Sequence, residues 1–427
     1  SVLLIVKEEK KIMNSFGQMK RYGIAIIVIV VVLAGIATYM YTRGGEGPVE
    51  NEQGEHPGWY GGDELVVWEW GGYDYENYYR GFTKKHPDVE VKFKIYGSIS
   101  EAVSKLAAGG RFDVSHMGVT YPRFLDRYYA QDSVAPIKTE WISRYENLYD
   151  FFKTNYVEDE HFRWNGKPYM IPTDWGTTSL IYNREMFEEA GLEPPNSWSA
   201  LWDPKYTETV GVAMWTAPGE ITQGIMAALG YSLEEYKHPT EEMLDEYENA
   251  VQKSFERMST SYTSGYKSYS ILGKEEAGIA MCWDEAYAYG IQGGVPLGYV
   301  GITPGTGFRE GEGYITWVSG LAIGKRTMTN GRYKLAHDFI DAWISAEYDP
   351  ETGAEGGLAN LNRYYYASTN KNVAKSPYAN QEIVEMMNLD NPIEKLETGL
   401  PVRSFLDATV WDKYTDRWIR AKTKAGL

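Results

Sequence analysis

The chain has 427 residues, of which 43% are apolar and 24% are charged, values that suit a globular protein large enough for two domains. Its formal net charge of −17 argues against a nucleic-acid partner, because phosphates require a basic surface. The single cysteine, Cys282, excludes an intrachain disulfide and any paired-cysteine motif, and we expect it to be a buried thiol.

An uncharged apolar segment lies near the N-terminus. Residues Gly23 to Met40 would form a helix about 27 Å long, close to the thickness of a bilayer's hydrocarbon core. Basic residues precede this segment and acidic residues follow it, which predicts a cytoplasmic tail over residues 1–22. A cleaved signal peptide is the alternative, but its apolar core would be shorter and ATYMY is a poor cleavage site. We therefore predict a transmembrane anchor or uncleaved signal over residues 23–42, with the rest on the extracellular side of the cell membrane.

A segment rich in glycine and acidic residues follows the predicted anchor. Residues 43–63 have no apolar periodicity, which is typical of a flexible linker. We expect this linker to keep the globular part close to the membrane.

From Glu64 onward, strand and helix patterns alternate. Strands are expected over 64–70, 89–97 and 112–119, with helices over 74–86 and 98–110 between them. This β-α-β-α-β order predicts an α/β fold with a mainly parallel sheet, whose ligand sites lie beyond the carboxyl ends of the strands.

A second α/β series follows the segment KPYMIPTDWGTTSLIYN. Its expected elements are strands over 210–216 and 276–284, helices over 221–230 and 239–259, the segment 295–305, and a strand over 314–325 that returns to the first lobe. We predict lobe 1 over 64–173 and 318–369, and lobe 2 over 174–317 and 370–427. Crossings are expected near Thr173–Gly176, Pro304–Trp317 and Tyr366–Asn370, and the interface between the lobes is where a ligand cleft is expected.

Several sequence blocks occur in a specific order. They are WEWGGYDYENYYRGFTKKHPDVEV, GGRFDV, IPTDWGTTSLIYN, SWSALWDPKYTETVGVAM, ALGYS, AMCWDEAYAYG, WVSGLAIGK and YTDRWIRAKTKAG. From Glu64 to Leu427 the chain thereby resembles the polyamine (spermidine/putrescine)-binding branch of the ABC transporter extracellular solute-binding proteins. The resemblance implies a two-lobed, periplasmic-binding-protein-like (type II) fold with a cleft between the lobes. It also implies a monomeric receptor that captures a small, cationic ligand and delivers it to ABC permease subunits in the membrane.

The resemblance further implies an aromatic ligand site, in which rings stack on a polyamine and carboxylates pair with its ammonium groups. Carried over position by position, the aromatic wall corresponds to Trp70, Trp175, Trp283 and Trp317, with Tyr73 nearby. Core filling is the alternative for each tryptophan. The expected ligand-binding residues are Trp70, Tyr73, Tyr121, Asp174, Trp175, Glu220, Trp283, Asp284, Trp317, Ser319 and Tyr366.

The carboxylates depart from the family pattern. Glu220 matches one expected acid, whereas Ala217 and Ser319 stand where two others are expected. Asp174 and Asp284 each adjoin an aromatic residue of the expected wall and could replace the missing acids, as could Glu69 and Glu285. A solvated or helix-capping role is the alternative for each of these acids.

Other functions receive less support from the residues. The six histidines are scattered without metal-ligand spacing, so we expect no metal and no cofactor. Metal binding by Tyr364–Tyr366 is an alternative, because some iron carriers bind the metal through adjacent tyrosines. A different cargo, such as a quaternary amine, an amino-acid-like zwitterion or a sugar, remains an alternative. A secreted glycoside hydrolase lacks any supporting motif, and a sensory ectodomain lacks a signalling module beyond the short tail, so we expect a binding protein and not an enzyme.

Overall fold

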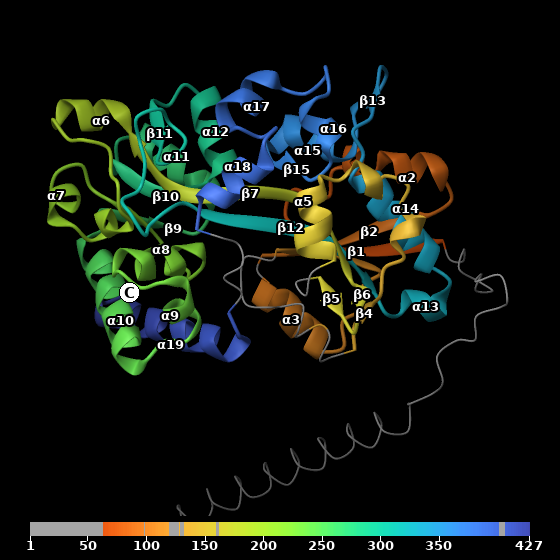
Figure 1. Cartoon of the computed structure of the whole chain (residues 1–427), viewed down its shortest axis with the longest axis horizontal. Helices are drawn as coiled ribbons and strands as arrows, with labels where there is room; N and C mark the ends of the chain where they lie inside the picture. Colours follow the sequence, from red (N-terminus) through yellow and green to blue (C-terminus); the bar gives the residue numbers. More distant parts are fainter. Residues whose placement is uncertain (1–62, 98, 119–127, 129–131, 159–161, 401–405) are drawn as a thin grey trace, which may run out of the picture. The chain divides into compact units, whose positions relative to one another are not determined.

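The computed structural model describes residues 63–427 except residues 98, 119–127, 129–131, 159–161 and 401–405 (Figure 1). The predicted tail and transmembrane segment, and nearly all of the predicted linker, lie outside the described residues. Within the described part, no helix has the length and hydropathy needed to cross a membrane. Residues Pro57–Leu427 form one compact unit, and this unit is the one considered below.

The first β-α-β-α-β series is confirmed. Strand β1 (Glu64–Trp70) pairs in parallel with β2 (Glu90–Tyr96) and β3 (Val114–Gly118), and α2 (Arg80–Lys85) and α3 (Ile99–Ala107) lie in the connections. Alternate side chains of β1 enter two different hydrophobic clusters on the two faces of the sheet, which is why its sequence is almost continuously apolar.

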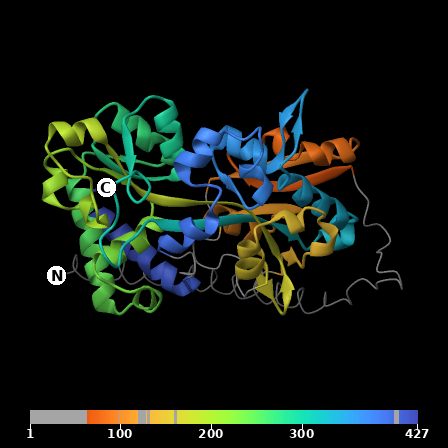
Figure 2. The same ribbon diagram turned by 45° about the horizontal axis from the view of Figure 1, so that its top comes forward.

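Two long antiparallel strands connect the two ends of this unit. They are β7 (Met170–Asn183) and β12 (Ile315–Gly324), which run side by side through the centre of Figures 1 and 2. The sheet order is β10-β7-β12-β3-β1-β2, and β12 is antiparallel to both of its neighbours. The expectation of a mainly parallel sheet is therefore wrong for its centre. The chain leaves the first lobe along β7 and returns along β12, so these two strands must run in opposite directions.

The second lobe forms around the far end of β7. Strands β10 (Ile279–Trp283) and β11 (Leu297–Tyr299) pair with β7, and β8 (Ala213–Trp215) pairs in parallel with β9 (Thr260–Tyr262). Cys282 on β10 is a buried free thiol, as predicted.

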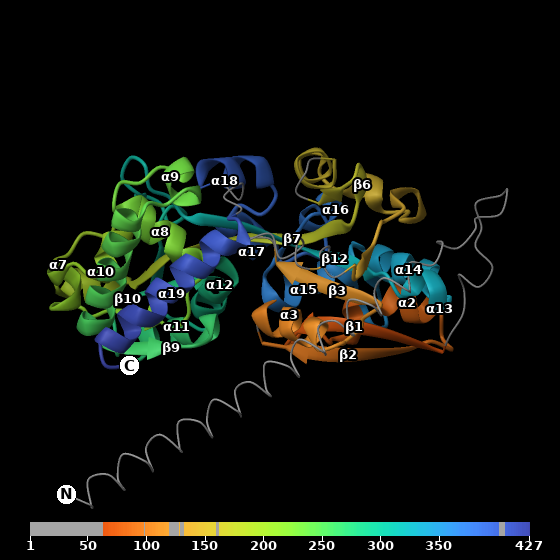
Figure 3. The same cartoon turned by 90° about the horizontal axis from the view of Figure 1, so that it is seen from below.

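The long amphipathic helix expected over 239–259 is confirmed as α10 (Glu241–Arg257), and the Thr240 hydroxyl caps it by accepting from the Met243 amide. It packs against the C-terminal helix α19 (Ala408–Lys424), and both lie on the same side of the second lobe in Figures 1 and 3. The Arg417 guanidinium of α19 pairs with Glu248 of α10 at 3.0 Å.

The remaining helices and strands are short. In the N-terminal half they are η1 (Glu76–Tyr78), β4 (Val134–Ala135), η2 (Thr139–Trp141), η3 (Tyr145–Asn147), α5 (Asp150–Phe152), the π-helical turn η4 (Lys153–Val157), β5 (Arg163–Trp164), β6 (Lys167–Pro168), α6 (Arg184–Glu189), η5 (Trp198–Leu201), α7 (Pro204–Thr207), α8 (Glu220–Ala228) and α9 (Leu233–Lys237). In the C-terminal half they are α11 (Gly265–Gly273), α12 (Asp284–Gln292), α13 (Thr327–Asn330), α14 (Tyr333–Trp343), β13 (Tyr348–Asp349), β14 (Gly353–Ala354), α15 (Gly356–Tyr364), β15 (Ala367–Ser368), α16 (Lys371–Ala374), α17 (Gln381–Met387) and α18 (Pro392–Thr398).

A third segment meets the two long strands at their midpoint. Strand β15 pairs with β7 opposite Asp174 and Trp175, close to the place where Trp317 and Ser319 of β12 pair with the other edge of β7. The three segments predicted to cross between the lobes therefore adjoin one another, while the lobe boundaries themselves stay a prediction.

A buried histidine joins three of these strands near that midpoint. His116 of β3 contacts Glu69 of β1 through Nδ1 at 2.7 Å and Asp174 of β7 through Nε2 at 3.2 Å. All three side chains are almost completely buried. The two carboxylates outweigh the cost of burial and raise the pKa of His116 to about 10, so the imidazole is held as a cation.

A second buried ion pair joins the start of α12 to α18. The Asp284 carboxylate accepts from the Lys395 ammonium at 2.9 Å and from the backbone amide of Thr177 at 3.0 Å. Lys395 also donates to the Met387 carbonyl at 2.8 Å, and both charged side chains are buried. This pair therefore ties α12 and α18 to β7.

The His116 cluster predicts a pH-dependent contribution to stability. The folded pKa lies above the ordinary value of 6.5, so the contribution is complete below pH 6.5 and is lost as the pH rises toward about 10. The unfolding free energy lost in the variant His116→Gln should therefore shrink by about 1.4 kcal/mol per pH unit over this window. Urea unfolding of both proteins at several pH values measures this loss, and a loss that does not change with pH would contradict the charged state of His116.

The Lys395–Asp284 pair predicts a strong single-variant effect. Lys395→Met leaves Asp284 buried without its cation and should cost about 3–5 kcal/mol of unfolding free energy. Adding Asp284→Asn to that variant should recover part of the loss, because no buried charge then remains. The exposed Lys413→Met is the matched control and should cost no more than about 0.5 kcal/mol in the same denaturation experiment.

Candidate ligand-binding site

Aromatic side chains gather where the three segments adjoin. The Tyr366 ring, just before β15, lies 5.5 Å from the Trp317 ring and 5.9 Å from the Tyr73 ring between centroids. Tyr73 follows β1 and also packs edge-on against His116 at 5.1 Å. These three residues were all expected in the ligand site, and the structure brings them together.

Glu285 is the acidic side chain of this cluster. It lies in the first turn of α12, is completely buried, and accepts a hydrogen bond from the Tyr366 hydroxyl at 2.9 Å. Its Oε2 atom has no hydrogen-bond partner among the described residues, and none of their lysines, arginines or histidines pairs with it. Burial, reinforced by the neighbouring charge of Asp284, raises the pKa of Glu285 well above its usual range.

Glu220 lies near Glu285. It is the first residue of α8 and is 8% exposed, and its charge contributes to the raised pKa of Glu285. The hydroxyl of Tyr266, from α11, lies close to Tyr366, and burial together with the charge of Glu285 raises the pKa of Tyr266. The second lobe therefore places two acidic groups beside the aromatic cluster.

Trp317 lies directly over the backbone of β7. A Cβ atom at Gly176 would come within 2.4 Å of the Trp317 ring and 2.6 Å of the Asp284 carboxylate, so glycine is required there. The Trp317 indole is 6% exposed, and its Nε1 donor has no partner among the described residues. Trp317 and Glu285 thus provide an unpaired donor and an unpaired acceptor in one cluster.

Trp283 is partly buried and packs edge-on against Trp215, with ring centroids 5.3 Å apart. Its ring also lies against Gly265, where a Cβ atom would come within 2.6 Å of it. Trp283 therefore lies at the end of β10 with one face occupied by the second lobe.

Other expected site residues have structural partners. Trp175 is completely buried, and its indole donates to the Ser368 carbonyl at 3.1 Å, so its ring packs in the core. Trp70 is partly buried and packs edge-on against Tyr96 at 4.6 Å. Ser319 is partly buried and pairs across the strands with Asp174.

Three further residues were expected to bind the ligand: Asp174, Asp284 and Tyr121. Asp174 and Asp284 already have cationic partners in His116 and Lys395, as described above, whereas Tyr121 lies outside the described residues. All of these assignments as ligand-binding residues stay predictions.

Some residues of the cluster were not foreseen by sequence reasoning. Glu285 was named only as a possible replacement acid, and Tyr266 and His116 were not named at all. The sequence did contain one indication that Glu285 has a role different from that of Asp284. Adjacent residues at a helix start point in different directions, so Asp284 and Glu285 should not share a role. Nothing in the local sequence distinguishes Tyr266 or His116 from ordinary core residues.

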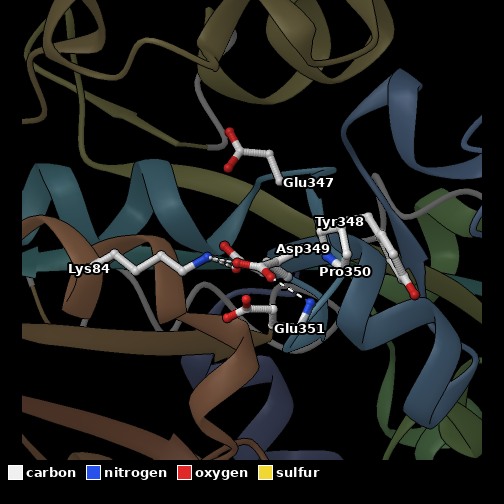
Figure 4. A pocket seen from close by; sticks show the side chains of 7 residues that line it. Lys84, Glu347, Tyr348, Asp349, Pro350 and Glu351 are labelled. Carbon is white, nitrogen blue, oxygen red and sulfur yellow. Dashed lines mark hydrogen bonds and ion pairs between the residues drawn. The ribbon is translucent and has the colours of Figure 1, made fainter.

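A separate surface pocket has charges that are satisfied internally. The Lys84 ammonium lies 2.6 Å from the carboxylate of Asp349, which it faces in Figure 4, and it also lies 2.6 Å from Glu355. The Asp349 carboxylate also accepts from the Glu351 amide. This pocket is therefore a surface ion-pair network.

Among solved structures, similarity extends over about 85% of this chain. A Listeria monocytogenes protein with the provisional description of a spermidine/putrescine ABC transporter is 18% identical, with a TM-score of 0.66, over 85% of this chain and 100% of its own. The Streptococcus pneumoniae spermidine/putrescine substrate-binding protein PotD, solved with calcium and HEPES, is 18% identical with a TM-score of 0.61, over 85% and 100%. The binding protein MotA of A. tumefaciens B6, in complex with glucopine, is 15% identical with a TM-score of 0.58, over 85% and 100%.

These similarities show a shared two-lobed α/β fold. In the comparison with curated proteins, no sequence matches this chain. The family of bacterial extracellular solute-binding proteins matches residues 68–350, more than half of the chain. The chain therefore belongs to the bacterial extracellular solute-binding proteins.

Proposed function

We propose that this solute-binding receptor captures a small, cationic amine among Tyr73, Trp317 and Tyr366, with Glu285 as its anionic partner. The ligand would then be delivered to the permease of an ABC importer. The proposal depends on one observation above all, which is that Glu285 is a buried carboxylate with no cation beside it in the described part of the chain.

Burial of an ionised carboxylate is costly unless a cation or several hydrogen-bond donors accompany it. Asp174 and Asp284 meet this requirement through His116 and Lys395. Glu285 has only the Tyr366 hydroxyl and keeps one oxygen without a partner among the described residues. An ammonium group beside Glu285 would supply both the missing charge and the missing donor.

The neighbouring rings suit the same class of ligand. A cation placed over the face of a tyrosine or tryptophan is attracted by about 0.5–2 kcal/mol, with the larger values in desolvated sites. Tyr366 contacts the Glu285 carboxylate directly, and its ring adjoins the rings of Tyr73 and Trp317. Their rings also pack on methylene groups, which is favourable for an alkyl amine.

The proposed site would couple ligand capture to closure of the lobes. Tyr73 and Tyr366 belong to the predicted lobe 1, and Glu285 belongs to the predicted lobe 2. A ligand that contacts all three would favour the closed arrangement, because only that arrangement provides both sets of contacts. The predicted membrane anchor over residues 23–42 would raise the receptor's effective concentration near the permease.

Ligand screening with a matched variant tests the proposal. In a thermal-shift assay, an amine at 100 times its dissociation constant should stabilise the protein by about 2.7 kcal/mol. Glu285→Gln should weaken that binding at least tenfold, because the ligand's charge loses its partner. Glu276→Gln is the control, since Glu276 is an exposed acid of the same lobe, and it should leave the shift unchanged. A response to sugars or uncharged solutes but not to amines would contradict the proposed cargo.

The raised pKa of Glu285 predicts a pH-dependent affinity. The folded carboxyl keeps its proton at pH values where an unfolded one, with its usual pKa of 4.5, has lost it. Above pH 4.5 the ligand-free protein therefore loses stability as the pH rises, while affinity for a cation increases by up to tenfold per pH unit. Calorimetric titration with a permanently charged quaternary amine measures this rise without interference from the ligand's own titration. A pH-independent affinity in the wild type, equal to that of Glu285→Gln, would remove Glu285 from the site.

A further inference from the structure

We propose that the ligand carries a single cationic group, so that the site selects a monoamine or quaternary amine over a diamine of the same length. This inference rests on the proposed function and narrows its ligand class. It follows from how the buried charges of the cluster are distributed between its two ends.

At the Tyr73 end, the carboxylates are already compensated. Asp174 and Glu69 both contact His116, and Thr173 donates a further hydrogen bond to Asp174 at 2.5 Å. Burial also raises the pKa of Glu69, and one Glu69 oxygen has no partner among the described residues. The His116 cation, edge-on to Tyr73, already partners both carboxylates, so this end of the cluster offers no unpaired anion to a second positive charge.

The negative charge of Asp284, which lies beside Gly176 and Trp317, is compensated as well. Its carboxylate contacts Lys395 at 2.9 Å and accepts from both the amide and the hydroxyl of Thr177. The lysine ammonium also lies 5.6 Å from the centroid of the Trp175 ring. A ligand ammonium would have to displace Lys395 to use this acid.

Among the described residues of the cluster, Glu285 is the acid that has no cationic partner. Glu285 is completely buried, and its Oε2 atom has no hydrogen-bond partner among the described residues, so this one carboxylate supplies one negative charge for a ligand. One ammonium group at Glu285 is therefore matched. A second ammonium at the far end of an alkyl chain would meet tyrosine rings and Ser319 instead of an unpaired carboxylate.

Ser319 offers a way to alter this selectivity. Its side chain is partly buried on β12, two residues after Trp317, and residues two apart lie on the same face of a strand. An aspartate at this position would add a carboxylate next to Asp174, with no cation of its own. It would thereby create an anionic site at the end of the cluster that lacks one.

The test compares matched amines on the full chain, purified in detergent because of its apolar N-terminal segment. Calorimetric titration uses butylamine against 1,4-diaminobutane and pentylamine against 1,5-diaminopentane. In the wild type, each monoamine should bind at least tenfold more tightly than its diamine. In Ser319→Asp the ratio should move at least tenfold toward the diamine, whereas the isosteric control Ser319→Asn should leave it on the side of the monoamine.

The outcomes separate this inference from the proposed function. A wild-type protein that binds the diamine as tightly as the monoamine, or more tightly, overturns the single-cation inference while the amine receptor stands. A wild-type protein that binds neither amine, but responds to a sugar, overturns both. The wild-type comparison decides the matter even if Ser319→Asp does not fold, and the far-ultraviolet circular dichroism spectrum reports whether it has folded.

Discussion

A carboxylate buried away from water requires a positive partner, and this requirement shapes the centre of the molecule. Two aspartates lie where the crossing strands meet, and each has a partner from elsewhere in the chain: His116 for Asp174 and Lys395 for Asp284. Glu285 accepts a hydrogen bond from the Tyr366 hydroxyl and has no cationic partner among the residues that the structure describes. The difference separates acids that hold the fold together from the acid that is available to a ligand.

The same strands serve both purposes. Strand β7 contributes Asp174 to the His116 cluster, and it contributes the Gly176 backbone on which Trp317 rests. The buried ion pairs therefore fix the crossing segments on which the aromatic side chains are mounted. This arrangement gives the cluster rigid supports, while its ligand groups come from both predicted lobes, so closure and capture would be one event.

Local patterns predicted much of this fold, because strand and helix periodicity, helix caps and the N-terminal β-α-β-α-β order depend on neighbouring residues. The antiparallel centre was not predicted, since the direction of β12 depends on where the chain returns after more than a hundred residues. The pairing of the buried acids could not be predicted from local sequence either. Asp284 and Glu285 look alike in sequence, and only the arrival of Lys395 from α18 distinguishes the structural acid from the unpaired one. Pairing over such distances leaves no local signal.

A crystal structure of the receptor with a bound amine tests the central claim most directly, because it locates the ligand's nitrogen relative to each acid. Our account predicts that nitrogen within about 3 Å of the Glu285 carboxylate, between the Tyr73 and Tyr366 rings. It also predicts that Asp174 and Asp284 still contact His116 and Lys395. A nitrogen bound to either aspartate, with its internal partner displaced, would contradict the division between structural and ligand-binding acids.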